Sequence, residues 1–260
     1  MKYWAFAFLI LFTSTKVFAQ RGGRGGPPPP PPMPRAGASI DLTGYWVSLV
    51  TEDWRHRQFT PPKGDYASVP IGPEGKKLAD AWDPAKDEAA GEQCKAYGAA
   101  GVMRLPTRLH IAWQDDNTLK LETDAGMQSR LFHFGKGPGA GGDWQGVSVA
   151  SWDTPQPVIR NSFGGLDFGF RPPPPPGGSL KVVTTKMRPG YLRKNGVPYG
   201  AATELTEYFE RFDVPGGDSL LLVISEVVDP EYLSQPFWTS SHFKKQNDAS
   251  GWNPTPCAAR

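Results

Sequence analysis

RLHIAWQDDNTLKLETDAGMQSRLFHF, residues 108–134, decides the fold because it contains three short apolar runs separated by two turn sequences. Each run alternates apolar and polar side chains, which is the two-residue period of a β-strand. The runs are Arg108–Trp113, Thr118–Thr123 and Gln128–Phe134. Asp, Asn and Gly at 115–117 and 124–126 favour tight chain reversals. This stretch therefore predicts three consecutive antiparallel strands.

Similar runs continue on both sides of this stretch. They are Thr43–Val50, Arg55–Phe59, Trp144–Trp152, Leu180–Met187, Thr203–Phe212, Ser219–Val228 and Phe237–Lys244. Many short strands with turn residues between them predict an all-β fold, here an antiparallel meander that closes into a barrel. One short helical segment is expected near 73–91, where Asp83 and Pro84 suit the N-cap and first helical positions. Long loops are expected at 135–143 and 161–178.

The first 38 residues differ in composition from the rest. Residues 1–19 combine Lys2, an apolar run at 4–12 and small residues before Gln20, and this pattern predicts a secretory signal peptide. Residues 20–38 are rich in Gly, Arg and Pro, which predicts a disordered linker. Its six consecutive prolines fit either a spacer or a docking ligand for an aromatic groove. The barrel domain is then expected to span 39–260, in an exported protein that is periplasmic or secreted.

Charge and motif content exclude several classes of function. Once the leader is removed with Lys2 and Lys16, 26 basic groups face 26 acidic ones, so no nucleic-acid partner is expected. The mature chain has no apolar run of about 20 residues, so we expect no transmembrane segment. Neither nucleotide-binding loops nor metal-ligand spacings occur, and we therefore expect no cofactor and no metal. The expected partners are a small-molecule ligand and, through the proline-rich tail, an envelope component.

The chain has two cysteines, Cys94 and Cys257. In an oxidising compartment, an even pair is most simply one disulfide, which would connect the middle of the chain to its end. The alternative is two free thiols.

The expected strands mix apolar and polar residues on both faces. This composition suits a barrel cavity that binds a small apolar or aromatic molecule. Amphipathic side chains of an ordinary core would give the same pattern. The candidate ligand-binding residues are Trp54, Arg55, Trp113, Arg130, Phe132 and Trp152.

An enzyme without an organic cofactor is the alternative function: a lyase, isomerase or hydrolase acting in the same cavity. Its candidate catalytic residues are His110, His133 and Glu122, one of which would act as the base. Each histidine could equally be structural. A second cluster, Glu52–Arg57, offers a carboxylate, an imidazole and guanidiniums for a base and an anion clamp, or a charged strand edge. A cell-envelope interaction module is the third possible function.

Several stretches resemble uncharacterised exported bacterial proteins. They include WRHRQFTPPKGDYASVP (54–70), PGYLRKNGVPYG (189–200) and VVDPEYLSQPFWTSSHFKK (227–245). The resemblance covers most of residues 40–257. It implies a lipocalin-like β-barrel and carries no activity with it.

Overall fold

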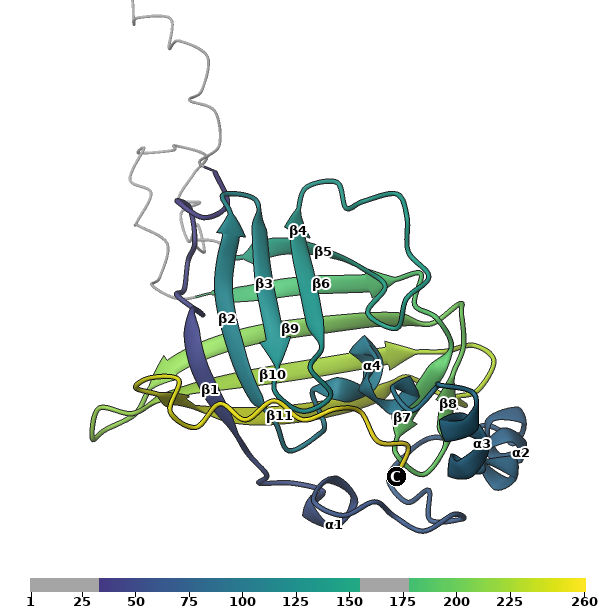
Figure 1. The fold of residues 1–260 in the computed structure, drawn as a ribbon. Helices are drawn as coiled ribbons and strands as arrows, with labels where there is room; N and C mark the ends of the chain where they lie inside the picture. Colours follow the sequence, from purple (N-terminus) through teal and green to yellow (C-terminus); the bar gives the residue numbers. More distant parts are fainter. Residues whose placement is uncertain (1–32, 155–177) are drawn as a thin grey trace, which may run out of the picture. The chain divides into compact units, whose positions relative to one another are not determined.

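The computed structural model describes residues 33–154 and 178–260. A closed barrel of nine strands forms its main body, which confirms the all-β barrel predicted from the sequence (Figure 1). The barrel strands are β1 (Gly44–Leu49), β2 (Arg108–Asp115), β3 (Thr118–Thr123), β4 (Ser129–Phe134), β5 (Val147–Asp153), β6 (Ser179–Thr185), β9 (Glu204–Asp213), β10 (Ser219–Val228) and β11 (Phe237–Gln246).

The strands follow the order β1-β11-β10-β9-β6-β5-β4-β3-β2, and β2 pairs with β1 to close the ring. The expected meander is present in β2–β3–β4 and in β9–β10–β11. Between these two groups the topology differs, because β4 and β5 pair in parallel. The glycine-rich connection at 135–146 joins them.

One predicted strand, Arg55–Phe59, is wrong. The segment forms the short helix α1 (Trp54–Arg57), because the carbonyl of Asp53 accepts hydrogen bonds from the backbone amides of His56 and Arg57. Two short strands were not predicted, β7 (Gly190–Arg193) and β8 (Val197–Tyr199), which pair with each other in a separate two-stranded sheet.

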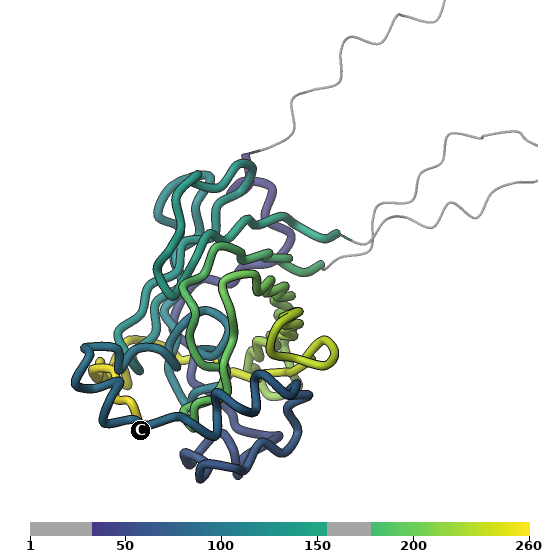
Figure 2. The backbone as a smooth tube through the Cα atoms, turned by 90° about the vertical axis from the view of Figure 1, so that its right-hand side faces the viewer, coloured from purple at the N-terminus to yellow at the C-terminus, as the bar shows by residue number. Residues whose placement is uncertain are grey.

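Short helices and the β7–β8 hairpin cover one end of the barrel, and we call them the cap (Figures 1 and 2). The helical segment predicted near 73–91 is confirmed as two helices, α2 (Pro73–Ala81) and α3 (Pro84–Ala89). The Asp83 carboxylate accepts a hydrogen bond of 3.0 Å from the amide of Ala85, so the expected N-cap is present. A 3₁₀ turn, η1 (Lys95–Tyr97), and helix α4 (Ala99–Val102) lead into β2.

Apolar side chains fill the barrel between its two ends. The interior cluster includes Trp46, Leu109, Phe132, Phe209 and Phe243, all fully buried. At the cap end, Val102 and Met103 enter the same cluster. At the opposite end, the rings of Trp113, Phe134 and Trp152 pack on one another with centroids 5.4–6.4 Å apart, and we call this the aromatic end.

Cys94 and Cys257 form a disulfide, as predicted. The bond attaches the C-terminal tail to the segment before η1. On its way there the tail pairs with the β3–β4 turn, where Ala125 bridges Thr255. Figure 1 shows the tail crossing the outside of the barrel before it reaches the cap.

Residues 33–38 make contacts with the aromatic end, so ordered contacts begin before the expected boundary at residue 39. The indole of Trp152 donates a hydrogen bond of 2.8 Å to the carbonyl of Pro34, and the Arg35 amide donates to Asp116. The predicted signal peptide (1–19), the linker as far as residue 32 and the loop predicted at 161–178, apart from Gly178, fall outside the described ranges.

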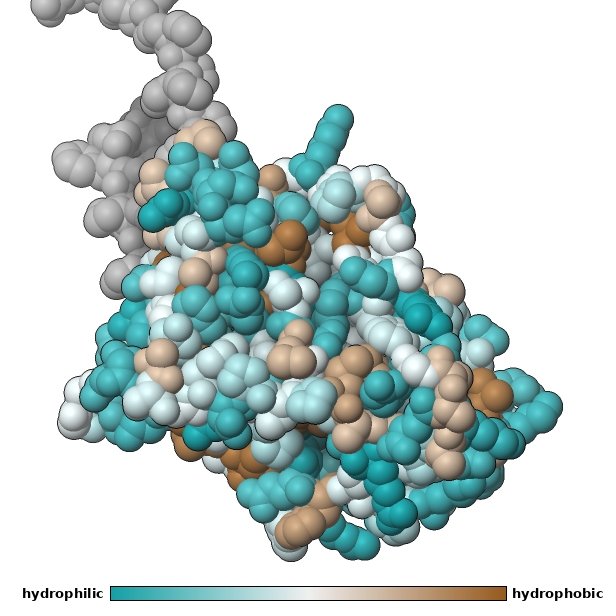
Figure 3. All heavy atoms as spheres, in the orientation of Figure 1, coloured by the Kyte–Doolittle hydropathy of each residue, from teal (hydrophilic) through white to brown (hydrophobic). Residues whose placement is uncertain are grey.

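Apolar residues on the face shown in Figure 3 occur in small separate patches among hydrophilic ones, which is an ordinary protein surface. Within the described residues, we find no helix that is both long and apolar enough to span a membrane.

Candidate functional site

A pocket of about 170 Å³ opens beside α1, between α1, β7 and the segment that leads into β2. Three arginines line it: Arg57 from α1, Arg104 from the segment after α4, and Arg193 from β7. We call it the arginine pocket. Buried or partly buried guanidiniums are costly unless their charge and donors are matched, so their partners decide what this pocket can do.

Arg57 is the most deeply buried of the three, with 5% of its surface exposed. Its Nε donates to the carbonyl of Arg104 at 3.0 Å, and its Nη1 donates to Oε1 of Glu52 at 2.8 Å. Its Nη2 is buried and has no hydrogen-bond partner among the described residues. Burial is the main cause that lowers the pKa of Arg57 to about 10, and the like charge of Arg104 adds to it.

Arg104 holds the start of α1 in place. Its Nη2 donates to Oδ2 of Asp53 at 2.6 Å, and its Nη1 donates to the carbonyl of Ser240 at 3.0 Å. Asp53 adopts a left-handed backbone conformation (φ 50°), which is uncommon for a residue with a side chain. Its ion pair with Arg104 therefore secures a strained turn at the start of α1. Burial lowers the pKa of Arg104 as well.

Arg193 approaches from the other side. Its Nη1 donates to the carbonyl of Ala67 at 2.7 Å, and its Nη2 donates to Oγ of Ser68 at 2.8 Å. The Ser68 hydroxyl in turn donates to the Asp53 carboxylate at 3.5 Å. Burial lowers the pKa of Arg193 to about 10.

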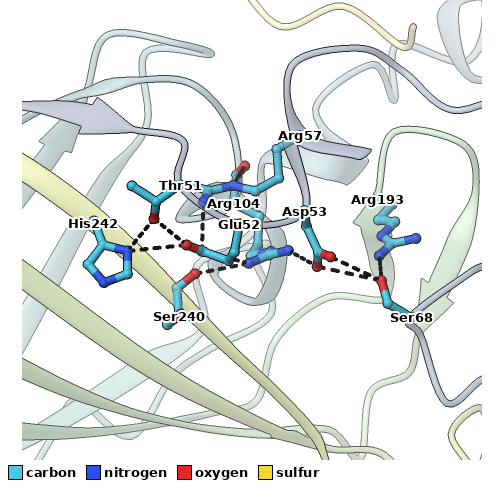
Figure 4. Close-up of polar contacts among 9 residues, drawn as sticks. All are labelled: Thr51, Glu52, Asp53, Arg57, Ser68, Arg104, Arg193, Ser240 and His242. Atoms are coloured by element: carbon cyan, nitrogen blue, oxygen red, sulfur yellow. Dashed lines mark hydrogen bonds and ion pairs between the residues drawn. The ribbon is translucent and has the colours of Figure 1, made fainter. Parts of the chain in front are cut away.

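Polar contacts run without a break from β11 to β7 (Figure 4). At one end, His242 Nδ1 lies 3.2 Å from Oε2 of Glu52, whose other oxygen contacts Arg57 and Arg104. Asp53 and Ser68 then connect Arg104 to Arg193. In this network three guanidiniums share two carboxylates, so the pocket has a surplus of positive charge.

The rest of the pocket lining combines apolar and aromatic residues with the polar side chains of Gln58, Thr60 and Lys194. Phe59, Tyr97, Leu105 and Leu192 contribute to it, together with His56, whose buried Nδ1 also has no partner among the described residues. Cationic side chains next to apolar ones suit a small ligand with an acidic group.

The predicted site residues on the barrel strands divide between its interior and its outer face. Phe132 is fully buried in the interior cluster, and Trp113 and Trp152 belong to the aromatic end. Arg130 is 1% exposed and makes a bidentate ion pair with Glu207, which is 0% exposed. A third contact joins Arg130 to the hydroxyl of Thr184 at 3.2 Å.

His110 and Glu122 lie together on the outer face, because both alternate with buried residues of β2 and β3. Their side chains are 3.0 Å apart, and the imidazole stacks on Tyr45 at 4.4 Å. Burial alone would raise the pKa of Glu122, but hydrogen bonds from Lys120 and His110 lower it below its usual value. His133 lies on the outer face of β4, beside neither of them in the strand register.

Trp54 and Arg55 lie on α1, outside the barrel. Trp54 is 58% exposed, and the side chain of Arg55 is 72% exposed and contacts Asp65 at 3.3 Å. The structure thus does not bring the six predicted ligand-binding residues together around one space.

Arg104 and Arg193 were not predicted, and Arg57 was recognised only as part of the charged cluster Glu52–Arg57. A signal was present for Arg104, a single charge in the otherwise uncharged run AYGAAGVMRLPT at 96–107. Such a residue must find a buried partner, although the sequence does not say which one. In the part of the chain that the structure describes, no group of three His, Cys, Asp or Glu residues could hold a metal ion.

Comparisons with protein-family models, with curated proteins and with solved structures find no significant match to this chain. The resemblance to exported lipocalin-like proteins stays a prediction, and the function must be argued from the geometry of the site.

Proposed function

We propose that this protein binds a small anionic molecule in the arginine pocket. The observation that carries the proposal is the unpartnered Nη2 of Arg57, a donor on a buried cation, beside two further guanidiniums. A buried donor left without an acceptor costs about 1–3 kcal/mol, and more when the group is charged. A carboxylate, sulfate or phosphate in the pocket would supply that acceptor and offset the surplus charge.

The apolar wall indicates what the rest of the ligand is like. Phe59, Tyr97 and Leu105 offer contact surface next to the guanidiniums. A cavity of about 150 Å³ holds one benzene ring, so 170 Å³ accommodates a ligand no larger than a substituted ring. The sequence predicts a small apolar or aromatic ligand inside the barrel. Our proposal keeps that chemistry, adds the acidic group, and places the ligand at the cap.

We further propose that the protein works outside the cytoplasm. The Cys94–Cys257 disulfide supports an oxidising compartment, and the sequence of residues 1–19 supports export. A soluble ligand carrier or sensor of the cell envelope agrees with both.

Calorimetric titration at constant ionic strength tests the proposal. Benzoate, phenyl phosphate and inorganic sulfate would be titrated into the full disulfide-bonded chain, with benzamide as the neutral analogue of benzoate. We expect an acidic compound to bind and benzamide not to bind. Arg57→Gln should weaken that binding about 10- to 100-fold, the equivalent of one charge-assisted hydrogen bond.

Arg55→Gln is the matched control, because it removes the same charge two residues away on the same helix from an exposed position. It should bind like the wild type. Equal losses in both variants would show a diffuse charge effect and contradict the proposed site. A folded wild-type protein that binds none of the acids would also contradict the proposed site. Circular dichroism and urea denaturation would check that each variant folds.

A further inference from the structure

A second recess lies on the cap, and six of its thirteen lining residues are aromatic residues or prolines. Trp82, Tyr191 and Tyr232 form its walls with Leu78, Pro189 and Pro198, and it measures about 340 Å³. We call it the aromatic groove. It does not include the three arginines, so a ligand in this groove is independent of the proposed anion site.

The chemistry of this groove fits a polyproline II segment. Such a segment presents flat proline rings and carbonyls that are not hydrogen-bonded within the segment, and aromatic grooves recognise it. Tyr191 and Tyr232 supply rings at the groove, while Lys86 at its edge is exposed and makes no ion pair within the described ranges. The Lys86 ammonium can therefore donate to a ligand carbonyl.

This chain itself contains a suitable ligand, the six prolines 27–32. That run joins the described chain at Met33, and the next residue, Pro34, is hydrogen-bonded to Trp152 at the aromatic end. The cap is at the opposite end of the barrel in both views (Figures 1 and 2). Two residues span about 7 Å at most, so the run starts too far from the groove of its own molecule to fill it.

We propose that the aromatic groove binds the proline run 27–32 of a second copy of this chain. The groove lining is balanced in charge, because Asp87 is paired with Lys95 at 2.9 Å and the lining also holds Asp83 and Lys86. It therefore does not repel a run that Arg24 and Arg35 flank. Binding a prolyl run also costs little conformational entropy, because its backbone is already restricted before it binds.

The positions of the proline run and the aromatic groove determine the kind of assembly. The run leaves from the aromatic end and the groove lies on the cap, so the contact is head-to-tail. A head-to-tail contact that does not close into a ring adds one copy after another. The expected species are therefore dimers, trimers and longer chains, whose proportions grow with concentration.

Sedimentation velocity of the full mature chain over a wide concentration range tests this proposal. We expect a concentration-dependent series of oligomers. A synthetic peptide of residues 24–35, RGGPPPPPPMPR, should shift that series to monomer, whereas the same peptide with alanine in place of residues 27–32 should not. Leu78→Glu, an exposed change in the groove wall, should weaken association at least about tenfold.

Phe212→Glu is the control, because it places the same charge at an exposed apolar residue of β9, away from the groove. It should associate like the wild type. A chain that stays monomeric and does not bind the peptide would overturn the proposal. So would oligomers that persist in Leu78→Glu, or a groove that binds unrelated proline-rich peptides but not 24–35.

Discussion

Two buried arginines, Arg130 inside the barrel and Arg57 at the cap, have different partners. Arg130 places both Nη atoms on Glu207, which has no other cation in contact within the described ranges. Arg57 contacts Glu52, a carboxylate that Arg104 and His242 also use. Each arginine has one buried nitrogen without a partner among the described residues, Nε in Arg130 and Nη2 in Arg57. The barrel nevertheless balances one cation with one anion, whereas the cap leaves a surplus cation beside an open pocket.

This difference separates a structural charge from a binding charge. A matched pair in the barrel interior fixes the packing of the strands that carry it and leaves no net charge to attract a ligand. A surplus cation next to an open pocket can be neutralised only from outside. Four predictions test this distinction, from the largest expected effect to the smallest.

Removing one member of the Arg130–Glu207 ion pair should have the largest effect on stability. Glu207→Leu leaves the Arg130 charge buried and unpaired, so the free energy of unfolding should fall by about 3–5 kcal/mol. Urea denaturation of the disulfide-bonded chain measures it. The double variant Arg130→Met with Glu207→Leu should recover most of the loss. If the single variant were as stable as the wild type, the pair would not have the structural role assigned here.

Removing the disulfide should loosen the cap before the barrel. Replacing Cys94 and Cys257 with serine should lower the free energy of unfolding by about 2–5 kcal/mol, with the upper end set by a sequence separation of 163 residues. Hydrogen exchange should rise first in the tail and around Tyr97, whose hydroxyl accepts from the Ala258 amide. Uniform loss of protection across the barrel strands would contradict this localisation.

Increasing the charge surplus should strengthen anion binding. Asp53→Asn keeps a side chain that tolerates the left-handed conformation and removes one of the two carboxylates. The affinity for the tightest-binding acid should rise about fivefold, the equivalent of about 1 kcal/mol. Calorimetry measures it, with Asp116→Asn at the aromatic end as the control. A lower affinity in a folded Asp53→Asn protein would contradict the surplus-charge argument.

The smallest effect is expected at His110 and Glu122 on the outer face of the barrel, where the pKa of Glu122 should change. Its folded-state pKa lies below the unfolded value, so ionised Glu122 contributes stability that is complete above the unfolded pKa near 4.5. That contribution is lost as the pH falls through the folded pKa. NMR titration should find the pKa below 4.5, and Lys120→Met should raise it. An unchanged value in Lys120→Met would show that the hydrogen bond has no influence.

Much of the barrel could be predicted from the sequence because its strands carry a local signal. The runs Thr118–Thr123 and Ser219–Val228 match their observed bounds at both ends, since alternation and turn residues mark a strand without reference to its partners. Strand order has no such signal. Nothing in residues 129–153 alone reveals that β5 runs parallel to β4. The Arg55–Phe59 prediction was wrong because one turn, made at Asp53, outweighed the strand propensity.

The candidate site could be predicted only in part, because its members are distant in the sequence. Arg57, Arg104 and Arg193 come from three segments that the cap brings together. Periodicity shows which face a side chain occupies on its own strand, but these arginines lie on short or irregular elements. His110 and Glu122 were two of the three candidate catalytic residues, and they pair across the β2–β3 hairpin, which was not predicted. Whether either acts in catalysis stays a prediction.

The strand count explains why the barrel contains a parallel pair. Each antiparallel contact reverses the strand direction, and a closed circuit must return to the direction in which it started, so the number of reversals is even. Nine contacts close this circuit, so at least one of them must be parallel. In this barrel eight contacts reverse the direction, and the parallel one is β4–β5. A tenth strand between β4 and β5 could restore strict alternation, whereas adding or losing one strand elsewhere would force another contact to change its sense.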